Sequence, residues 1–106
     1  MRRRSVVLRA RARGDVDEAI AHYLDQAGVE VANGFIGALE EAFEHLAGSP
    51  GSGSPRYGHE VSLPGLRSWP LKSYPFLVFY MTTADRIDVW RVLHERRDIP
   101  AWLRAP

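Results

Sequence analysis

The spacing of apolar residues predicts one strand and two helices in the first half of the chain. Over Ser5–Ala10 the apolar residues Val6, Leu8 and Ala10 occupy every second position, as on the buried face of a half-buried strand. From residue 16 to residue 46 apolar side chains recur at helical spacing, interrupted at Gly28, which suits the end of a helix. We expect the first helix to begin after Asp15, a good N-cap, and the second to end by Gly48. Because the link at Gly28 is so short, the two helices must form an antiparallel hairpin.

The second half carries shorter apolar runs that predict strands. Residues 66–71 predict a strand at a sheet edge or a bulge, because Pro70 lacks the N–H that an inner strand donates. The run Phe76–Thr82 is apolar on both faces and predicts a central strand. A hairpin loop then leads to a last strand over Ile87–Leu93.

Three further segments have weaker patterns. Ser49–Pro55 is rich in Gly, Ser and Pro and predicts a flexible loop. A short strand is expected at 59–63, and one helical turn at 99–103, started by Pro100. Residues 1–106 therefore predict a single α+β domain in the order β-α-α-β-β-β. The helix hairpin packs on one face of a largely antiparallel sheet, and the other face meets solvent or a partner.

Charge is unevenly distributed along the chain. Residues 1–13 contain six arginines and no acidic residue, whereas residues 15–44 contain eight acidic residues and no Lys or Arg. The net charge of +1 does not by itself indicate nucleic-acid binding. Cysteine is absent, which excludes disulfides, thiolate catalysis and cysteine-ligated metals.

The chain carries no recognisable membrane or export signal. No apolar run approaches the roughly 18 residues of a membrane span. After the N-terminal arginines only Val6–Leu8 is apolar, too short for a signal peptide. We therefore expect a cytoplasmic protein without membrane association. The four histidines are scattered without metal-ligand spacing, and His22 and His45 are expected on helix surfaces.

A cluster of charged and imidazole side chains follows the last predicted strand. Residues 94–98 are His, Glu, Arg, Arg and Asp, placed where that strand leaves the sheet. Arginine and histidine at an exposed strand end suit an anionic partner. The alternative is that the arginines pair with acidic residues nearby: Arg91 and Arg97 with Asp88, Glu95 or Asp98.

Residues in both predicted helices and in the sheet match one family in the expected order. They are Ala12, Asp15, Val16, Ile20 and Tyr23; Phe35, Leu39, Ala42, Leu46 and Pro50; and Pro64-Gly65-Leu66-Arg67, Phe79-Tyr80, Arg91-Val92-Leu93-His94 and Arg97-Asp98. Over nearly its whole length the chain resembles the ParE toxins of the ParE/RelE superfamily, the toxin half of bacterial type II toxin–antitoxin pairs. The C-terminal stretch is the most specific part.

The resemblance implies a toxin that acts by binding. ParE toxins interfere with DNA gyrase and are not known to do bond chemistry, whereas RelE toxins share the fold and cut mRNA in the ribosome. Both are neutralised by an antitoxin whose C-terminal segment wraps along the toxin. We expect a gyrase inhibitor in a hetero-oligomer with a cognate ParD-like ribbon-helix-helix antitoxin, and no cofactor or metal. The alternatives are a RelE-like ribosome-dependent mRNA endonuclease and an inactive antitoxin-binding homologue.

Candidate site residues follow from these alternatives. For contact with gyrase or another partner they are Arg67, Trp90, Arg91, His94, Arg96, Arg97 and Trp102, with Trp102 expected to be partly exposed. For an antitoxin groove they are Ile20, Tyr23, Phe35, Leu39 and Phe43. A nuclease would use Arg67, Lys72 and His94. The predicted central strand supplies no cation for such chemistry.

Overall fold

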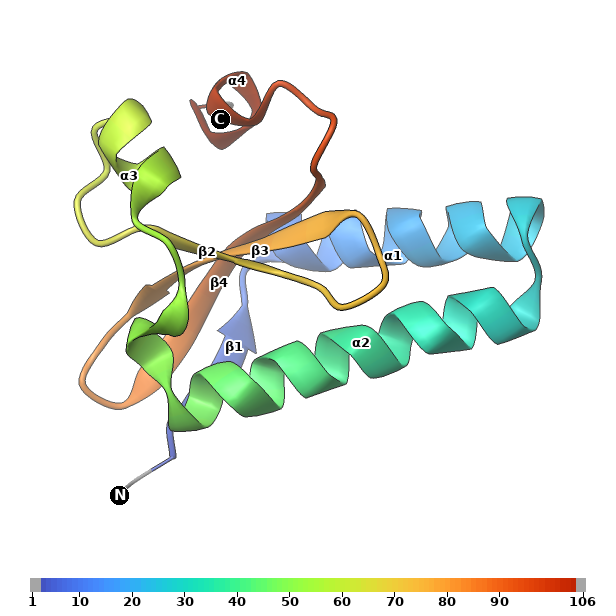
Figure 1. The fold of residues 1–106 in the computed structure, drawn as a ribbon, viewed down its shortest axis with the longest axis horizontal. Helices are drawn as coiled ribbons and strands as arrows, with labels where there is room; N and C mark the ends of the chain where they lie inside the picture. Colours follow the sequence, from blue (N-terminus) through green and yellow to red (C-terminus); the bar gives the residue numbers. More distant parts are fainter. Residues whose placement is uncertain (1–2, 105–106) are drawn as a thin grey trace.

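A computed structural model describes residues 3–104 of the chain (Figure 1). The strands are β1 (Ser5–Leu8), β2 (Arg67–Pro70), β3 (Phe76–Thr82) and β4 (Arg86–His94). The helices are α1 (Ala10–Gln26), α2 (Val29–Gly48), the 3-10 turn η1 (Pro50–Ser52), α3 (Arg56–Glu60) and α4 (Ile99–Arg104). Across the described residues, no helix combines the length and apolar character needed to cross a membrane.

The four strands form a mixed sheet in the order β1-β4-β3-β2. β1 runs parallel to β4, whereas β4, β3 and β2 form an antiparallel meander. The predicted α+β fold with a largely antiparallel sheet is therefore confirmed. Pro70 ends the edge strand β2, as predicted, and β3 lies inside the sheet.

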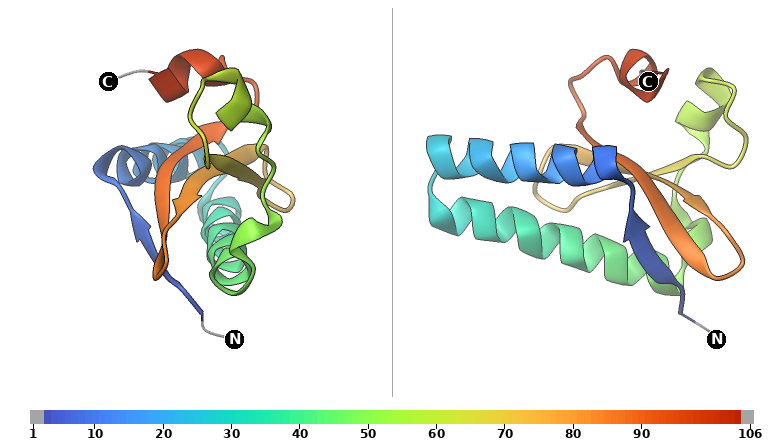
Figure 2. Two further views of the ribbon diagram at one scale, coloured as in Figure 1. Left: turned by 90° about the vertical axis from the view of Figure 1, so that its left-hand side faces the viewer. Right: turned by 180° about the vertical axis from the view of Figure 1, so that it is seen from behind.

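Helices α1 and α2 form the predicted hairpin and cover one face of the sheet (Figures 1 and 2). Phe35, Leu39 and Leu46 of α2 are buried together with Val78 and Tyr80 of β3. These helix residues are spaced by four and seven positions, so they lie on one side of α2. The periodic pattern of the sequence therefore found the core-facing side correctly.

Aromatic rings pack between the hairpin and the start of β3. The ring centre of Phe35 lies 5.1 Å from that of Phe76 and 5.4 Å from that of Tyr23. Tyr74 packs edge-on against Phe35, with 5.7 Å between centres. The Tyr74 hydroxyl donates a hydrogen bond to the Val31 carbonyl oxygen at 2.9 Å, which ties the β2–β3 connection to α2.

The other face of the sheet is covered by α3 and α4, which corrects the expectation that it meets solvent or a partner (Figure 2). Ile99 and Leu103 of α4 are buried with Phe79 and Leu93 of the sheet. Val61, directly after α3, joins the same cluster. A six-residue helix with two core-facing side chains is too short to show this packing in its sequence pattern.

One predicted boundary and one predicted strand are wrong. Helix α1 begins at Ala10, with Arg9 before it, and not after Asp15. The chain passes directly from β1 into the helix, which tolerates Gly14 in its second turn. In place of the strand predicted at 59–63, the chain forms the end of α3 and a turn. A five-residue run is too short for periodicity to separate a strand from a helical turn.

The glycine- and serine-rich loop, predicted to be flexible, is held by two side chains from the sheet. The Tyr80 hydroxyl donates to the Pro50 carbonyl oxygen at 2.8 Å and accepts from the Gly53 N–H at 2.9 Å. Nη1 of Arg67 donates to the Gly53 carbonyl oxygen at 2.7 Å. Burial raises the pKa of Tyr80 and outweighs the lowering effects of the Gly53 N–H and of Arg67.

A β-bulge at Trp90 changes the direction of the side chains along β4. β3 pairs with Val89 and next with Arg91, so Trp90 has no partner across the ladder. Val89 and Val92 consequently both face the helix hairpin, although they are three residues apart. Arg91 points instead toward α4, where its Nη1 donates to a carbonyl oxygen.

Candidate functional site

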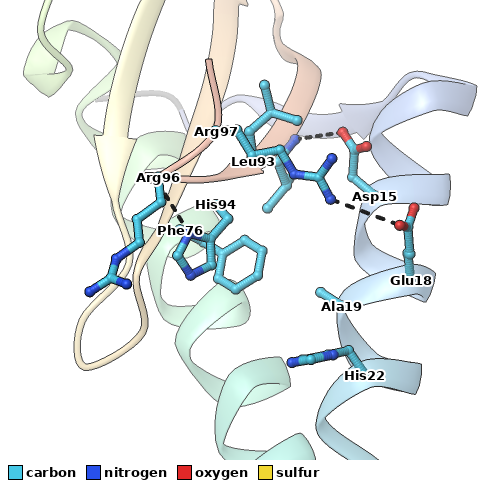
Figure 3. A pocket seen from close by; sticks show the side chains of 10 residues that line it. Asp15, Glu18, Ala19, His22, Phe76, Leu93, His94, Arg96 and Arg97 are labelled. Carbon is cyan, nitrogen blue, oxygen red and sulfur yellow. Dashed lines mark hydrogen bonds and ion pairs between the residues drawn. The ribbon is translucent and has the colours of Figure 1, made fainter. Parts of the chain in front are cut away.

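The end of β4 and the turn that follows form the candidate site (Figure 3). His94 is the last residue of β4 and lies edge-on to Phe76, with 5.2 Å between ring centres. The N–H of Arg96 donates to Nδ1 of His94 at 3.1 Å. The N–H of Arg97 donates to the His94 carbonyl oxygen at 3.0 Å. In a neutral ring the bond accepted by Nδ1 leaves Nε2 of His94 as the N–H donor.

A pocket of about 330 Å³ opens between this turn and α1, and we call it the α1 pocket. It is lined by Asp15, Glu18, Ala19 and His22 of α1 and by Phe76, Val92, Leu93, His94, Arg96 and Arg97. Figure 3 shows His22 reaching from α1 toward the space beside His94 and Phe76. The pocket thus combines apolar side chains with imidazole, guanidinium and carboxylate groups.

The carboxylate of Asp15 is neutralised within the structure. It accepts hydrogen bonds from Nε and Nη2 of Arg91, both at 2.8 Å, and from the N–H of Val92 at 3.0 Å. The Arg91 and Asp15 side chains are 8% and 11% exposed. β1 ends at Leu8, before it reaches the part of β4 that contains Val92. The Asp15 carboxylate therefore accepts the Val92 N–H in place of a neighbouring strand. The hydrogen bond to Asp15 raises the pKa of Arg91 against the opposing effect of burial.

The arginines at the end of β4 pair with α1 and not with the acidic residues nearest in sequence. Arg91 pairs with Asp15, and Nη2 of Arg97 lies 3.9 Å from Oε1 of Glu18. The predicted alternative of ion pairing is therefore right in kind and wrong in its partners. Asp15 and Glu18 are three residues apart on α1, one helical turn, so both face the end of β4.

Trp102 of α4 lies against two of these guanidinium groups. The Arg97 guanidinium is 4.1 Å from the centre of the Trp102 ring, and that of Arg91 is 5.5 Å away. Nη1 of Arg91 also donates to the Trp102 carbonyl oxygen at 3.1 Å. The Trp102 residue is 37% exposed, so its predicted partial exposure is confirmed. Arg97 and Trp102 form a cationic and aromatic surface that the buried Arg91 contacts from the protein interior.

Two residues predicted to contact a partner lie mostly inside the protein. Arg91 is buried and occupied by Asp15. Trp90 is half-buried under the Arg9 guanidinium, 4.2 Å from the ring centre, and Arg9 pairs with Asp88 at 2.9 Å. Among residues 3–104 the buried Nε1 of Trp90 has no hydrogen-bond partner. Both residues therefore make contacts within the protein that stabilise the sheet and its neighbours.

The three residues considered for a nuclease lie at separate places. Arg67 is bonded to the glycine-rich loop. Lys72 lines a different pocket, between α2 and β2, and His94 lines the α1 pocket. In the sheet, Arg67 lies opposite Tyr80 of β3, and His94 lies opposite Phe76 of the same strand. Phe76 and Tyr80 are four residues apart, so Arg67 and His94 are separated by about 13 Å along β3.

The residues predicted to line an antitoxin groove belong to the core or its border. Phe35 and Leu39 are buried between the hairpin and the sheet. Ile20, Tyr23 and Phe43 are partly buried and pack against the same core. The α1 pocket is formed by a neighbouring side of α1 that the prediction did not include.

Sequence patterns did not single out the α1 residues that line the pocket. Asp15, Glu18 and His22 follow each other at three and four residues, a spacing that places them on one side of a helix. That signal was available, but Asp15 is predicted as a helix cap and His22 as an isolated surface residue. Within residues 3–104, no group of three His, Asp or Glu side chains is placed to hold a metal ion.

A second pocket, of about 300 Å³, lies between α2 and β2. The His45 ring stacks on Trp69 with 4.4 Å between centres and an angle of 18°. Nε2 of His45 is 3.0 Å from Oγ of Ser52 in η1. Glu41 and Lys72 complete its polar lining. Its histidine already has a partner, so this pocket offers fewer free groups than the α1 pocket.

Comparison with known proteins gives one consistent result. The family model described as the ParE toxin of the type II toxin–antitoxin system parDE matches residues 6–99. Toxin ParE3 of Caulobacter vibrioides is 30% identical over 92 residues, covering 85% of each chain. A solved chain of the chromosomal ParDE system from P. aeruginosa has a TM-score of 0.71 at 24% identity, covering 86% of this chain and 95% of that chain. The last match supports the fold.

Proposed function

The chain belongs to the ParE toxin family of type II toxin–antitoxin systems, and we propose that it inhibits DNA gyrase by protein–protein contact. A cognate ParD-like antitoxin of the ribbon-helix-helix type neutralises it in a hetero-oligomer. Its place of action in this proposal is the cytoplasm, where gyrase works on the chromosome. The proposed action requires no bond chemistry by the toxin itself.

The observation that carries this proposal is the surface of Arg97 and Trp102 beside His94. Arginine and tryptophan are the residue types that most often dominate the energy of protein interfaces. Arg97 is stacked on Trp102 and lies next to Glu18, so the surface is ordered before binding. Such preorganisation lowers the entropy that association costs.

The arrangement of the cations favours binding over RNA cleavage. Cleavage requires an acid, a base and cations around one phosphate. Arg67, Lys72 and His94 lie in three different surroundings. The central strand between Phe76 and Thr82 carries no cation that could join them. A ribosome-dependent nuclease would therefore need residues that this structure does not bring together among 3–104.

Pulse-labelling of cells directly after induction of the toxin tests this function. The proposal predicts that DNA synthesis falls before protein synthesis. Trp102→Ala should slow that fall, because it removes the exposed indole. Val29→Ala, which changes an exposed apolar residue at the far end of the hairpin, serves as the matched control and should act like the wild type. An earlier fall in protein synthesis would reject gyrase and point to the ribosome.

A further inference from the structure

The two carboxylates of the α1 pocket are both engaged with arginines. Asp15 accepts from Arg91 and from the Val92 N–H, which uses both of its oxygens. Glu18 lies 3.9 Å from the Arg97 guanidinium, an ion-pair distance longer than a hydrogen bond, and its side chain is 76% exposed. The buried carboxylate of the pocket, Asp15, therefore retains little acceptor capacity for any further N–H group, whereas the Glu18 carboxylate faces solvent.

Three N–H donors face or border the same pocket without a partner among residues 3–104. Arg96 is exposed and borders the pocket, and Figure 3 shows its guanidinium on the other side of His94 from His22. The His22 ring extends from α1 into the space of the pocket (Figure 3). His94 accepts at Nδ1, which leaves its Nε2–H to donate. Helix, strand and turn thus each supply one donor to a single pocket.

The rest of the lining is apolar. Phe76, Val92 and Leu93 border the pocket from the sheet, and Ala19 borders it from α1. A ligand that satisfies both kinds of surface carries an anionic head on a short aliphatic stem. Aspartate and glutamate side chains have this form, and their carboxylate accepts several N–H bonds at once.

We propose that the α1 pocket binds an aspartate or glutamate side chain from an extended acidic segment of the antitoxin. The carboxylate accepts from His22 and His94, and the exposed Arg96 side chain turns toward it on binding. Its aliphatic stem lies against Phe76 and Leu93. The identity of the partner rests on the proposed function, whereas the chemistry of the ligand rests on the pocket.

Binding at this place has a consequence for regulation. Arg97 lines the α1 pocket and also stacks on Trp102. An antitoxin segment seated in the pocket therefore lies next to the surface proposed to contact gyrase. Neutralisation then follows from competition for one region of the toxin, without a change of its fold.

Titration with two capped tripeptides, followed by NMR of the histidine rings at constant pH 7, tests the pocket. The probes are leucine–glutamate–leucine and its glutamine counterpart. We expect the glutamate peptide to shift the ring signals of His22 and His94 and to leave His45 and His59 unchanged. The glutamine peptide should bind at least tenfold more weakly. Equal binding of the two peptides, or equal shifts of all four histidines, would overturn the proposal.

Two variants and a nucleic-acid probe sharpen the test. Arg96→Gln and His22→Gln should each weaken binding of the glutamate peptide at least threefold. Arg86→Gln, an exposed arginine at the opposite end of β4, is the matched control and should bind like the wild type. If a short thymidine oligonucleotide shifts the same two histidines at lower concentration than the peptide, the ligand is a nucleic-acid phosphate and the antitoxin assignment fails.

The antitoxin itself provides the last step. Changing its acidic residues singly to amides should reveal one whose loss weakens the complex at least tenfold. The same change should have little further effect on a toxin that already carries His22→Gln and Arg96→Gln. Additive effects would reject the contact. Because no gyrase is present in these measurements, failure of the pocket and failure of the proposed target are separate results.

Discussion

Asp15 and Arg91 are joined by two hydrogen bonds of 2.8 Å although 76 positions separate them in the chain. The pair fastens α1 to β4 at the point where β1 has ended. It also neutralises the carboxylate nearest the end of β4, so the α1 pocket keeps an excess of donors. One buried contact therefore serves both the fold and the electrostatics of the candidate site.

Loss of Asp15 should destabilise the protein strongly. Asp15→Ala leaves the Arg91 guanidinium buried without a counterion and removes the acceptor of the Val92 N–H. We expect the free energy of unfolding to fall by about 3–5 kcal/mol, measured by urea denaturation. Asp17→Ala, on the exposed side of the same helix, should change it by less than about 0.5 kcal/mol. Similar losses in the two variants would contradict the assigned role.

Gly53 is required for the close approach of the loop to the sheet. A Cβ at this position would lie 2.8 Å from the Ser68 carbonyl oxygen and 2.5 Å from the Tyr80 hydroxyl. Gly53→Ala should therefore lower stability by about 1–3 kcal/mol in thermal unfolding. Gly51→Ala meets no atom within 4 Å and is the matched control. If both substitutions leave the melting temperature unchanged, the loop is not held as described.

The Tyr80 hydroxyl should titrate at unusually high pH. Burial raises its pKa above the ordinary value of 10.0. Because the folded pKa exceeds the unfolded one, this contribution to stability is complete below the unfolded pKa and is lost as pH rises through the folded pKa. The ultraviolet absorbance of phenolate, compared between wild type and Tyr80→Phe, measures the midpoint. A difference spectrum with its midpoint at or below the ordinary value would contradict the assignment.

The C-terminal helix has a structural role that a deletion would remove together with the proposed binding surface. Ile99 and Leu103 of α4 are 2% and 8% exposed over Phe79 and Leu93. Truncation after Arg97 should therefore lower the free energy of unfolding by about 2–4 kcal/mol, measured by urea denaturation. A truncated chain as stable as the full one would show that α4 adds nothing to the core.

The point substitution Trp102→Ala should separate the proposed binding from folding. The indole is 37% exposed and stacks on Arg97. We expect inhibition of gyrase to weaken at least tenfold, while the free energy of unfolding changes by less than about 1.5 kcal/mol. The paired measurements are a supercoiling assay and a urea titration. Unchanged inhibition by a folded variant would exclude this surface.

Local patterns in the sequence predicted those parts of the fold that depend on local chemistry. Helical spacing placed Phe35 on the apolar side of the second helix, although it was assigned to an antitoxin groove and not to the core. The unbroken apolar run from Phe76 to Thr82 predicted an inner strand. Pro70 marked the edge strand because it lacks a backbone donor. Each of these signals lies within a few residues of the element that it describes.

The remaining features depend on contacts between distant residues. Asp15 has the chemistry of a helix cap, and only the folded structure shows that its carboxylate serves Arg91 instead. The bulge at Trp90 changes which side chains of β4 face the helix hairpin and which face α3 and α4, and no local sequence pattern predicts it. The α1 pocket joins residues from opposite ends of the chain, so its position followed from the fold alone.

Inhibition of purified DNA gyrase by the intact chain is the most direct test of the central claim. The measurement is the supercoiling of relaxed plasmid DNA at increasing concentrations of the toxin, with and without its antitoxin. We expect supercoiling to fall as the toxin is added and to recover when the antitoxin is present in excess. Full supercoiling in a large molar excess of folded toxin would contradict it.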